Sequence, residues 1–228
     1  SQIELRVAAG LSGDSKLVEV FKADGDIHTA VAEQVFNVPP ELVDKEMRRR
    51  AKVINFGILY GMGVNALRMN LGAGVSREEA SAFLNDYFKN FSGLSMWLER
   101  VKGDAARTGY TETLFGRRRY FPGFKSPLPQ MRAQAERMAT NAPIQGTQSD
   151  IIKLAMVEAE KLIEKKKWQD KVKLMLQIHD ELVYEIDDDI AEEAAQEIRH
   201  VMENVVPVSR LADVPILAEA AIGKNWGE

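Results

Sequence analysis

The chain contains 228 residues with a formal net charge of −4 at pH 7 and no cysteine, so disulfides and thiolate metal sites are excluded. Apolar residues make up 45% of the sequence, which is enough to bury a core in one or two compact units. No apolar run reaches the roughly 18 residues that a membrane-spanning helix needs, so we expect no membrane partner.

Helix patterns fill the first half of the chain. Asp44 is a good N-cap, and we predict that the helix it begins runs to about Tyr60, where Gly61 ends it. Ser76, with Glu79 three residues later, forms a capping box that begins another helix. Further helices are predicted over residues 5–11, 28–36 and 94–107.

The second half mixes hairpins and helices. Residues 109–122 place aromatic residues and threonines around Gly116, which predicts a β-hairpin. A helix over 131–141 is expected to break at Pro143 and Gly146 and to restart near Thr147.

Residues 172–187 alternate apolar and polar side chains on both sides of a polar turn, which predicts two strands. His179, Asp180 and Glu181 are expected in the turn itself. A helix over 189–205 and a short strand at 216–221 follow. Because strands lie at the two ends and helices between them, the predicted fold class is α+β, with a helical insertion into a sheet domain.

Basic residues are grouped although the total charge is acidic. One cluster covers 48–50 with Lys52, and another covers 117–119. Such clusters can steer a polyanion locally, and short basic runs also occur as solvated surface. Charge alone therefore leaves nucleic-acid binding open.

Four residues of the predicted helix 44–60 are spaced by four and form one slowly drifting stripe: Arg48, Lys52, Phe56 and Tyr60. The two cations could hold a triphosphate, and the two aromatic rings could stack on a base or a sugar. The alternative is an ordinary amphipathic helix whose aromatic residues belong to the core.

The turn between the last two long strands could hold a metal ion. Asp180 there would be an exposed carboxylate between rigid flanks, a ligand that suits Mg²⁺ with substrate phosphates. The alternative is a turn that uses Asp for its backbone preference. A His-Asp phosphohydrolase site needs several histidines on helices, and the chain has only His28, His179 and His200.

Two further sets of polar residues could have either a functional or a structural role. Arg137, Asn141 and Gln145 are spaced by four and could point toward a groove, or they could form a solvated helix face. His28 follows a predicted helix start and by itself is compatible with a structural role.

Together these segments resemble the family A DNA polymerases. Residues 1–6 are similar to motif A without its first two residues, 48–61 to motif B and 177–181 to motif C. Residues 26–29, 113–120 and 137–146 also resemble the family, in the expected order. The resemblance covers essentially the whole chain. It implies an antiparallel palm sheet with a large helical fingers insertion: palm 1–25, fingers 26–122 and palm 123–228.

The resemblance also implies roles for individual residues. Asp180 would bind metal, and Lys52 would neutralise or protonate the departing charge. His179 would touch the primer terminus. The residues implied to contact the incoming nucleotide are Gln2, Glu4, His28, Arg48, Lys52, Phe56 and Tyr60. The residues implied to contact DNA are Arg117, Arg118, Arg137, Asn141 and Gln145.

The implied activity is template-directed DNA synthesis in replication and repair. A primer 3′-hydroxyl would attack the α-phosphate of a dNTP, assisted by two Mg²⁺ ions. The expected partners are primer-template DNA and dNTP. The expected location is the cytoplasm of a bacterial or phage-infected cell, with an organelle also possible.

The sequence departs from the family pattern at its start. The family has Asp-Tyr directly before the position of Ser1, and that Asp is the other metal ligand. We therefore expect the chain to be inactive alone and to need an upstream polypeptide that carries this Asp-Tyr and the thumb. Ser1 is compatible with processing, a split-intein junction or an arbitrary cloning boundary. The competing functions are a non-catalytic DNA-binding module and a metal-dependent nuclease.

Overall fold

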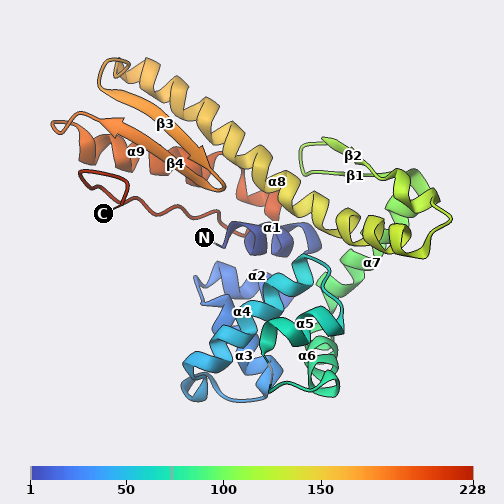
Figure 1. Cartoon of the computed structure of the whole chain (residues 1–228). Helices are drawn as coiled ribbons and strands as arrows, with labels where there is room; N and C mark the ends of the chain where they lie inside the picture. Colours follow the sequence, from blue (N-terminus) through green and yellow to red (C-terminus); the bar gives the residue numbers. More distant parts are fainter. Residues whose placement is uncertain (1, 73, 228) are drawn as a thin grey trace.

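The computed structural model describes residues 2–72 and 74–227, and its architecture is α+β, as predicted (Figure 1). The helices are α1 (Ile3–Ser12), α2 (Ser15–Lys22), α3 (Ile27–Phe36), α4 (Lys45–Leu59), α5 (Val64–Leu71), α6 (Arg77–Asn90), α7 (Ser92–Thr108), α8 (Pro129–Lys166) and α9 (Ala191–Asn204). The strands are β1 (Tyr110–Glu112), β2 (Arg118–Tyr120), β3 (Val172–Ile178) and β4 (Glu181–Ile186). Short 3-10 helices lie at Pro40–Leu42, Pro122–Lys125 and Val208–Leu211.

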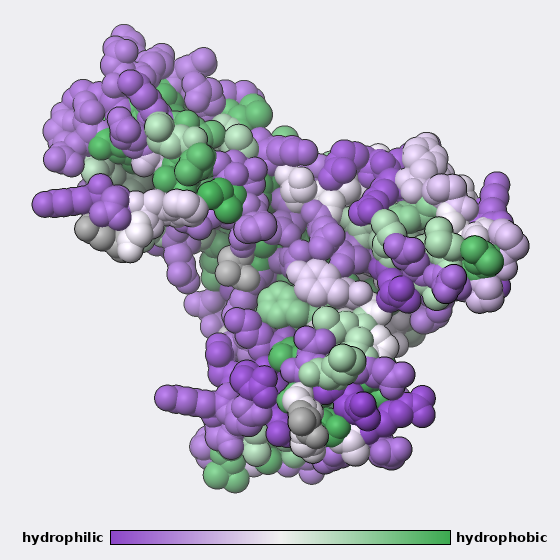
Figure 2. All heavy atoms as spheres, in the orientation of Figure 1, coloured by the Kyte–Doolittle hydropathy of each residue, from purple (hydrophilic) through white to green (hydrophobic). Residues whose placement is uncertain are grey.

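Helix α8 runs diagonally across the molecule and connects its parts (Figure 1). Helices α3 to α6 gather on one side, and the β3–β4 hairpin lies with α9 beside the other end of α8. Both described sheets are two-stranded and antiparallel. Polar residues cover much of the face in Figure 2, with apolar residues showing mainly between the lobes and near the hairpin.

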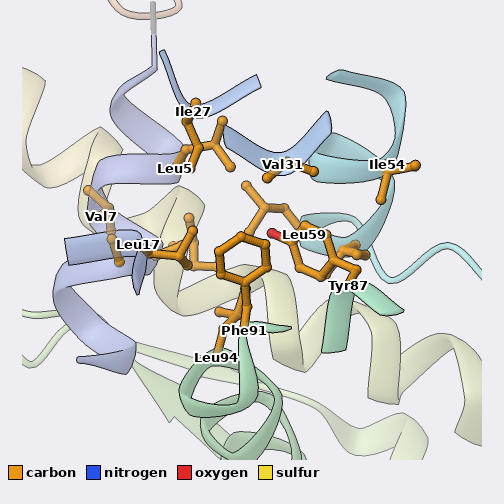
Figure 3. Packing of buried hydrophobic residues seen from close by; sticks show 14 of the residues in the cluster. Leu5, Val7, Leu17, Ile27, Val31, Ile54, Leu59, Tyr87, Phe91 and Leu94 are labelled. Atoms are coloured by element: carbon orange, nitrogen blue, oxygen red, sulfur yellow. The ribbon is translucent and has the colours of Figure 1, made fainter. Parts of the chain in front are cut away.

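The main core joins α1 to the helical lobe. Side chains from α1, α2, α3, α4, α6 and α7 converge on it in Figure 3, which labels Leu5, Val7, Leu17, Ile27, Val31, Ile54, Leu59, Tyr87, Phe91 and Leu94. A smaller core lies under the β3–β4 hairpin, where Trp168 and Val172 pack against Ile163 of α8 and Ile198 of α9. None of the helices in the described ranges has the length and apolar run required to cross a bilayer.

Several local predictions are confirmed. Asp44 caps α4 by accepting a hydrogen bond from the Met47 N–H at 2.7 Å. Ser76 and Glu79 form the reciprocal capping box of α6. The hairpin around Gly116 is present, with Gly116 at φ 81°. The remaining helices that were predicted begin and end within about two residues of the observed bounds.

The predicted break at Pro143 and Gly146 is wrong, because α8 continues through both residues. A proline inside a helix removes one backbone hydrogen bond. Tertiary contacts outweigh that loss here. Pro143 is buried, and the Leu114 N–H donates to the buried Thr147 Oγ1 at 2.9 Å. A Cβ on Gly146 would lie 2.6 Å from Thr113 Cγ2, so the glycine permits close packing of the β1–β2 connection on α8.

Two predictions near the C-terminus also fail. Residues 216–221 form no strand; Ile216 is buried in the main core, and the Ala218 N–H donates to Glu203 Oε1 at 3.2 Å instead of to a sheet. Glu181 is the first residue of β4 and pairs with Ile178, so the turn consists of His179 and Asp180 alone.

One buried carboxylate ties the start of the chain to its middle. Asp14 caps α2 by accepting from the Leu17 N–H at 3.1 Å, and its second oxygen accepts from the Leu94 N–H in α7, also at 3.1 Å. A Cβ on Gly93 would come within 2.9 Å of the Asp14 backbone. The absence of a side chain at Gly93 therefore allows this contact.

Asp14→Ala should lower the free energy of unfolding by about 2–4 kcal/mol, because it removes a helix cap and leaves the buried Leu94 N–H without an acceptor. Asp44→Ala is the matched control, since Asp44 caps an exposed helix end and accepts no bond from a distant helix. Its expected cost is about 1 kcal/mol. Chemical denaturation followed by circular dichroism measures both. Equal losses would contradict the bridging role of Asp14.

Candidate active site

An open cleft of about 460 Å³ lies where α1, α4, α8 and the β3–β4 hairpin meet. Six of the residues predicted to act on a substrate line it together: Glu4, Phe56, Tyr60, Gln145, His179 and Asp180. These residues come from four segments that are far apart in the sequence. The fold therefore assembles them into one site.

The β3–β4 turn places a carboxylate at the edge of the cleft. His179 has φ 52°, a left-handed conformation that lets the chain reverse in two residues. The Gln177 Nε2 group donates to the His179 carbonyl at 2.8 Å and braces the turn. Glu181 lies outside the cleft lining and accepts a 2.8 Å hydrogen bond from Trp226 Nε1.

Asp180 is a hard oxygen ligand of the kind that Mg²⁺ prefers. Within residues 2–72 and 74–227, no group of three or more His, Asp or Glu side chains could hold a metal ion by itself. A metal ion held by Asp180 would therefore need further oxygen ligands from other molecules or from outside the described residues.

A hydrogen bond crosses the cleft between α1 and the end of α4. The Tyr60 hydroxyl donates to Glu4 Oε2 at 2.9 Å. Burial, reinforced by the Glu4 carboxylate, raises the pKa of Tyr60 to about 12, so the phenol remains a donor at neutral pH. Phe56 stacks on Tyr60 with the ring centroids 6.3 Å apart. The two aromatic rings thus form one wall.

The two cations of the α4 stripe do not line this cleft. Arg48 Nε lies 2.6 Å from Asp26 Oδ2. Partial burial acts to raise the pKa of Asp26, but hydrogen bonds from Arg48, Thr29 and the His28 N–H outweigh it and lower the pKa to about 2. Lys52 is exposed, and within the described residues no hydrogen bond or ion pair holds its ammonium group.

His28 is buried beside the stripe. Its Nδ1 lies 3.1 Å from the Asn55 Nδ2 amide, and its ring is 6.0 Å from the Phe56 ring. Burial lowers the pKa of His28; Asp26 opposes this, and Arg48 and Lys52 reinforce it. The buried Asn55 Oδ1 has no hydrogen-bond partner among the described residues.

The residues predicted to contact DNA are spread along α8 and the β1–β2 hairpin. Gln145 lines the cleft, whereas Arg137 packs beside Gly61, where a Cβ would lie 3.1 Å from Arg137 Cγ. Gly61 has φ 65°, so its backbone also favours glycine. Asn141 is half-buried, and its Oδ1 has no hydrogen-bond partner among the described residues.

Arg117 and Arg118 are held by pairs within the chain. Arg117 Nε lies 2.8 Å from Asp150 Oδ1, and Arg118 Nε lies 2.7 Å from Glu112 Oε1. Neither arginine lines the main cleft. Gln2 precedes α1 without a side-chain capping bond and is also outside the lining. Ser1, with the predicted start of motif A, lies outside the described residues.

Sequence reasoning missed several residues that shape the site. Gln148, Ser149 and Lys153 line the cleft from α8. Ser149 and Lys153 continue the four-residue spacing of Gln145, but the predicted helix break hid that continuity. Asp26 was overlooked as the partner of Arg48, although its position before α3 is a recognisable N-cap.

Comparisons with known proteins agree with these motifs. Residues 1–228 match the family model described as DNA polymerase family A. A thermostable DNA polymerase I of Thermus filiformis is 47% identical over 228 residues, which cover 100% of this chain and 26% of that protein. DNA polymerase I of Pseudomonas aeruginosa is 43% identical over 228 residues, which cover 100% of this chain and 24% of that protein. The chain thus spans about a quarter of the length of these relatives.

A solved structure matches the fold as well. It is described as the POL domain of Pol1 from M. smegmatis in complex with DNA primer-template and dNTP. The TM-score is 0.87 at 41% sequence identity, and the match covers 94% of this chain and 36% of that chain.

Removing the guanidinium of Arg48 should raise the pKa of Asp26 from about 2 toward the ordinary value of about 3.9. A depressed pKa contributes stability that is present above about pH 4 and is lost as the pH falls toward 2. Arg48→Ala should therefore flatten the acid dependence of stability in this window. Carboxyl NMR titration measures the shift directly.

Arg49→Ala is the control for this titration, because Arg49 pairs with Glu46 rather than with Asp26. It should leave the titration of Asp26 unchanged. An Asp26 pKa that stays near 2 in Arg48→Ala would show that the other hydrogen bonds suffice to hold the carboxylate ionised.

Proposed function

Because the chain belongs to DNA polymerase family A, we propose that it supplies the nucleotide-binding helix and one metal-binding aspartate of a DNA-directed DNA polymerase. The reaction is nucleotidyl transfer from a dNTP to a primer 3′-hydroxyl. The observation that carries this proposal is the cleft that joins Asp180 and His179 to Glu4, Phe56 and Tyr60.

The proposed division of the chain is palm 1–25, fingers 26–122 and palm 123–228. Two observations support it: the lobe of α3 to α6 lies apart from the β3–β4 hairpin in Figure 1, and the hairpin has a hydrophobic cluster that it shares with α8 and α9 and not with that lobe. In this division the aromatic half of the α4 stripe, Phe56 and Tyr60, shares the cleft with the Asp180 turn. Movement of that lobe would make nucleotide binding a condition for completing the site.

The proposed nucleotide contacts follow from the chemistry of each group. Arg48 binds the triphosphate by exchanging its half-buried partner Asp26 for phosphate oxygens. His28 contacts the triphosphate, and Lys52 neutralises or protonates the leaving pyrophosphate. Phe56 packs on the sugar, which would disfavour dideoxynucleotides.

The α1 side of the cleft serves to select the sugar. Glu4 blocks the ribose 2′ position and holds Tyr60 beside the templating base through the 2.9 Å hydrogen bond. Gln2 adds a contact to the nucleotide from the same segment. Release of Tyr60 from Glu4 is a small cost, because Tyr60 remains partly exposed.

Metal chemistry would be supplied by two Mg²⁺ ions, which together activate the primer hydroxyl and stabilise the leaving oxygens. Asp180 is the ligand that this chain contributes. The second metal-binding aspartate and the thumb are proposed to come from a partner segment that carries an Asp-Tyr pair.

The proposed DNA contacts extend along α8. Arg137 and Gln145 read the minor groove of the nascent pair, with Asn141 nearby. His179 touches the primer terminus. Arg117 and Arg118 contact the DNA backbone. The M. smegmatis structure, whose title names DNA primer-template and dNTP, supports primer-template DNA and dNTP as the partners. The proposed location is the bacterial cytoplasm, in keeping with the bacterial relatives.

Joining the chain to an upstream segment that ends in Asp-Tyr should produce Mg²⁺-dependent primer extension. In the joined protein, Lys52→Ala should reduce the extension rate by about 10²–10⁴-fold, the usual contribution of a proton donor. Asp180→Ala should cost at least as much, because it removes a metal ligand. Single-turnover extension and primer-template affinity are measured together.

Both variants should keep most of their primer-template affinity, since neither residue is proposed to hold the DNA. Lys89→Ala, at an exposed position on α6, is the control and should extend at the unsubstituted rate. Extension that survives both Lys52→Ala and Asp180→Ala would contradict the proposal. DNA binding without extension would favour a non-catalytic module, and nucleotide release without added dNTP would favour a metal-dependent nuclease.

A further inference from the structure

The continuity of α8 extends its polar stripe beyond the residues that the motifs mark. Gln145, Ser149 and Lys153 follow one another at intervals of four, and all three line the main cleft. At 1.5 Å per residue, Lys153 lies about 12 Å along the helix from Gln145. That distance equals about three to four nucleotide steps of a DNA strand.

Lys153 is the only lysine or arginine among the described residues that line this cleft. It is exposed, and within the described ranges no hydrogen bond or ion pair holds its ammonium group. Most other cations near the proposed DNA path are paired within the chain, as Arg117 is with Asp150 and Arg118 is with Glu112. An exposed ammonium in a concave polar site is suited to bind a phosphate.

The position of Lys153 indicates whether it would bind a phosphate of the nucleotide or a phosphate of the DNA backbone. The cations proposed for the triphosphate, Arg48 and Lys52, belong to α4 and lie outside the lining of this cleft. Lys153 belongs to α8, and the cleft that it lines also contains the His179–Asp180 turn. The backbone of the primer strand would pass this turn on its way to the 3′ end.

We propose that Lys153 binds a primer-strand phosphodiester a few nucleotides from the 3′ terminus and thereby positions the primer over the Asp180 turn. This role rests on the proposed polymerase function. Lys153 acts here as a positioning residue, because it holds the strand and not the reacting atoms. Its contact is with the backbone and is therefore independent of base sequence.

The salt dependence of DNA binding tests the contact. The logarithm of the association constant for primer-template DNA falls linearly with the logarithm of the salt concentration. Lys153→Ala should make this slope less steep by about 0.9, the value for one lost phosphate contact on duplex DNA. Lys153→Arg keeps the charge and should keep the slope. Lys161→Ala, two turns further along α8 where Lys161 pairs with Glu158, is the matched control and should change nothing. Fluorescence anisotropy of the joined protein that carries the Asp-Tyr segment provides the measurement.

A neutral methylphosphonate placed at single positions locates the phosphate. At the contacted primer position it should weaken binding by the unsubstituted chain and have no further effect on Lys153→Ala, which is the non-additivity expected of a direct pair. The same change in the template strand should weaken both proteins equally. Amine-reactive footprinting of the unsubstituted chain gives a second measurement: DNA should protect Lys153 and leave Lys161 reactive.

Three results would overturn the assignment: an unchanged slope in Lys153→Ala, full additivity at every primer position, or a loss of dNTP affinity in place of DNA affinity. The last result would mean that Lys153 binds the triphosphate of the nucleotide and not the primer strand. If the joined protein that carries the Asp-Tyr segment does not bind primer-template DNA, the proposed function itself fails. If it binds and Lys153→Ala is neutral, only the role of Lys153 fails.

Discussion

The unbroken course of α8 past Pro143 is the constraint on which the rest of the structure depends. The helix contacts α1, α7, α9 and β1, so elements from the beginning, middle and end of the chain pack against one helix. An interior proline costs a helix about 3 kcal/mol. Burial of residues 142–144 and the Leu114–Thr147 hydrogen bond offset that cost. The position of the β1–β2 hairpin therefore depends on the continuity of α8.

Several polar groups in and around the site have partners within the chain. Arg48 pairs with Asp26, Tyr60 with Glu4, and Arg117 with Asp150. Such exposed or half-exposed pairs contribute little to stability, typically about 0–1 kcal/mol. They can therefore exchange a protein carboxylate for a phosphate at small cost. The pairs keep long side chains in defined orientations, which reduces the entropy that binding must remove.

Local chemistry made much of this molecule predictable. Asp44 and Ser76 predict the starts of their helices correctly, because side-chain capping depends only on neighbouring residues. The turn at Asp180 is equally local, and ordered motifs linked it to the stripe of Arg48 and Phe56. The break at Pro143 and the strand at 216–221 were mispredicted because packing partners decide both. Folding brings Asp26 next to Arg48 and brings Lys153 into the same cleft as the Asp180 turn. Sequence spacing alone therefore could not assign a role to either residue.

The hydrogen bond from Trp226 to Glu181 has an optical consequence. The chain has three tryptophans; Trp97 and Trp168 are each 8% exposed, whereas Trp226 is 57% exposed. The indole of Trp226 therefore emits at longer wavelength than the two buried rings, and it touches a carboxylate next to Asp180. Any change in charge or solvation at the turn acts on this one fluorophore. The molecule thus carries an intrinsic spectroscopic reporter at the edge of its candidate active site.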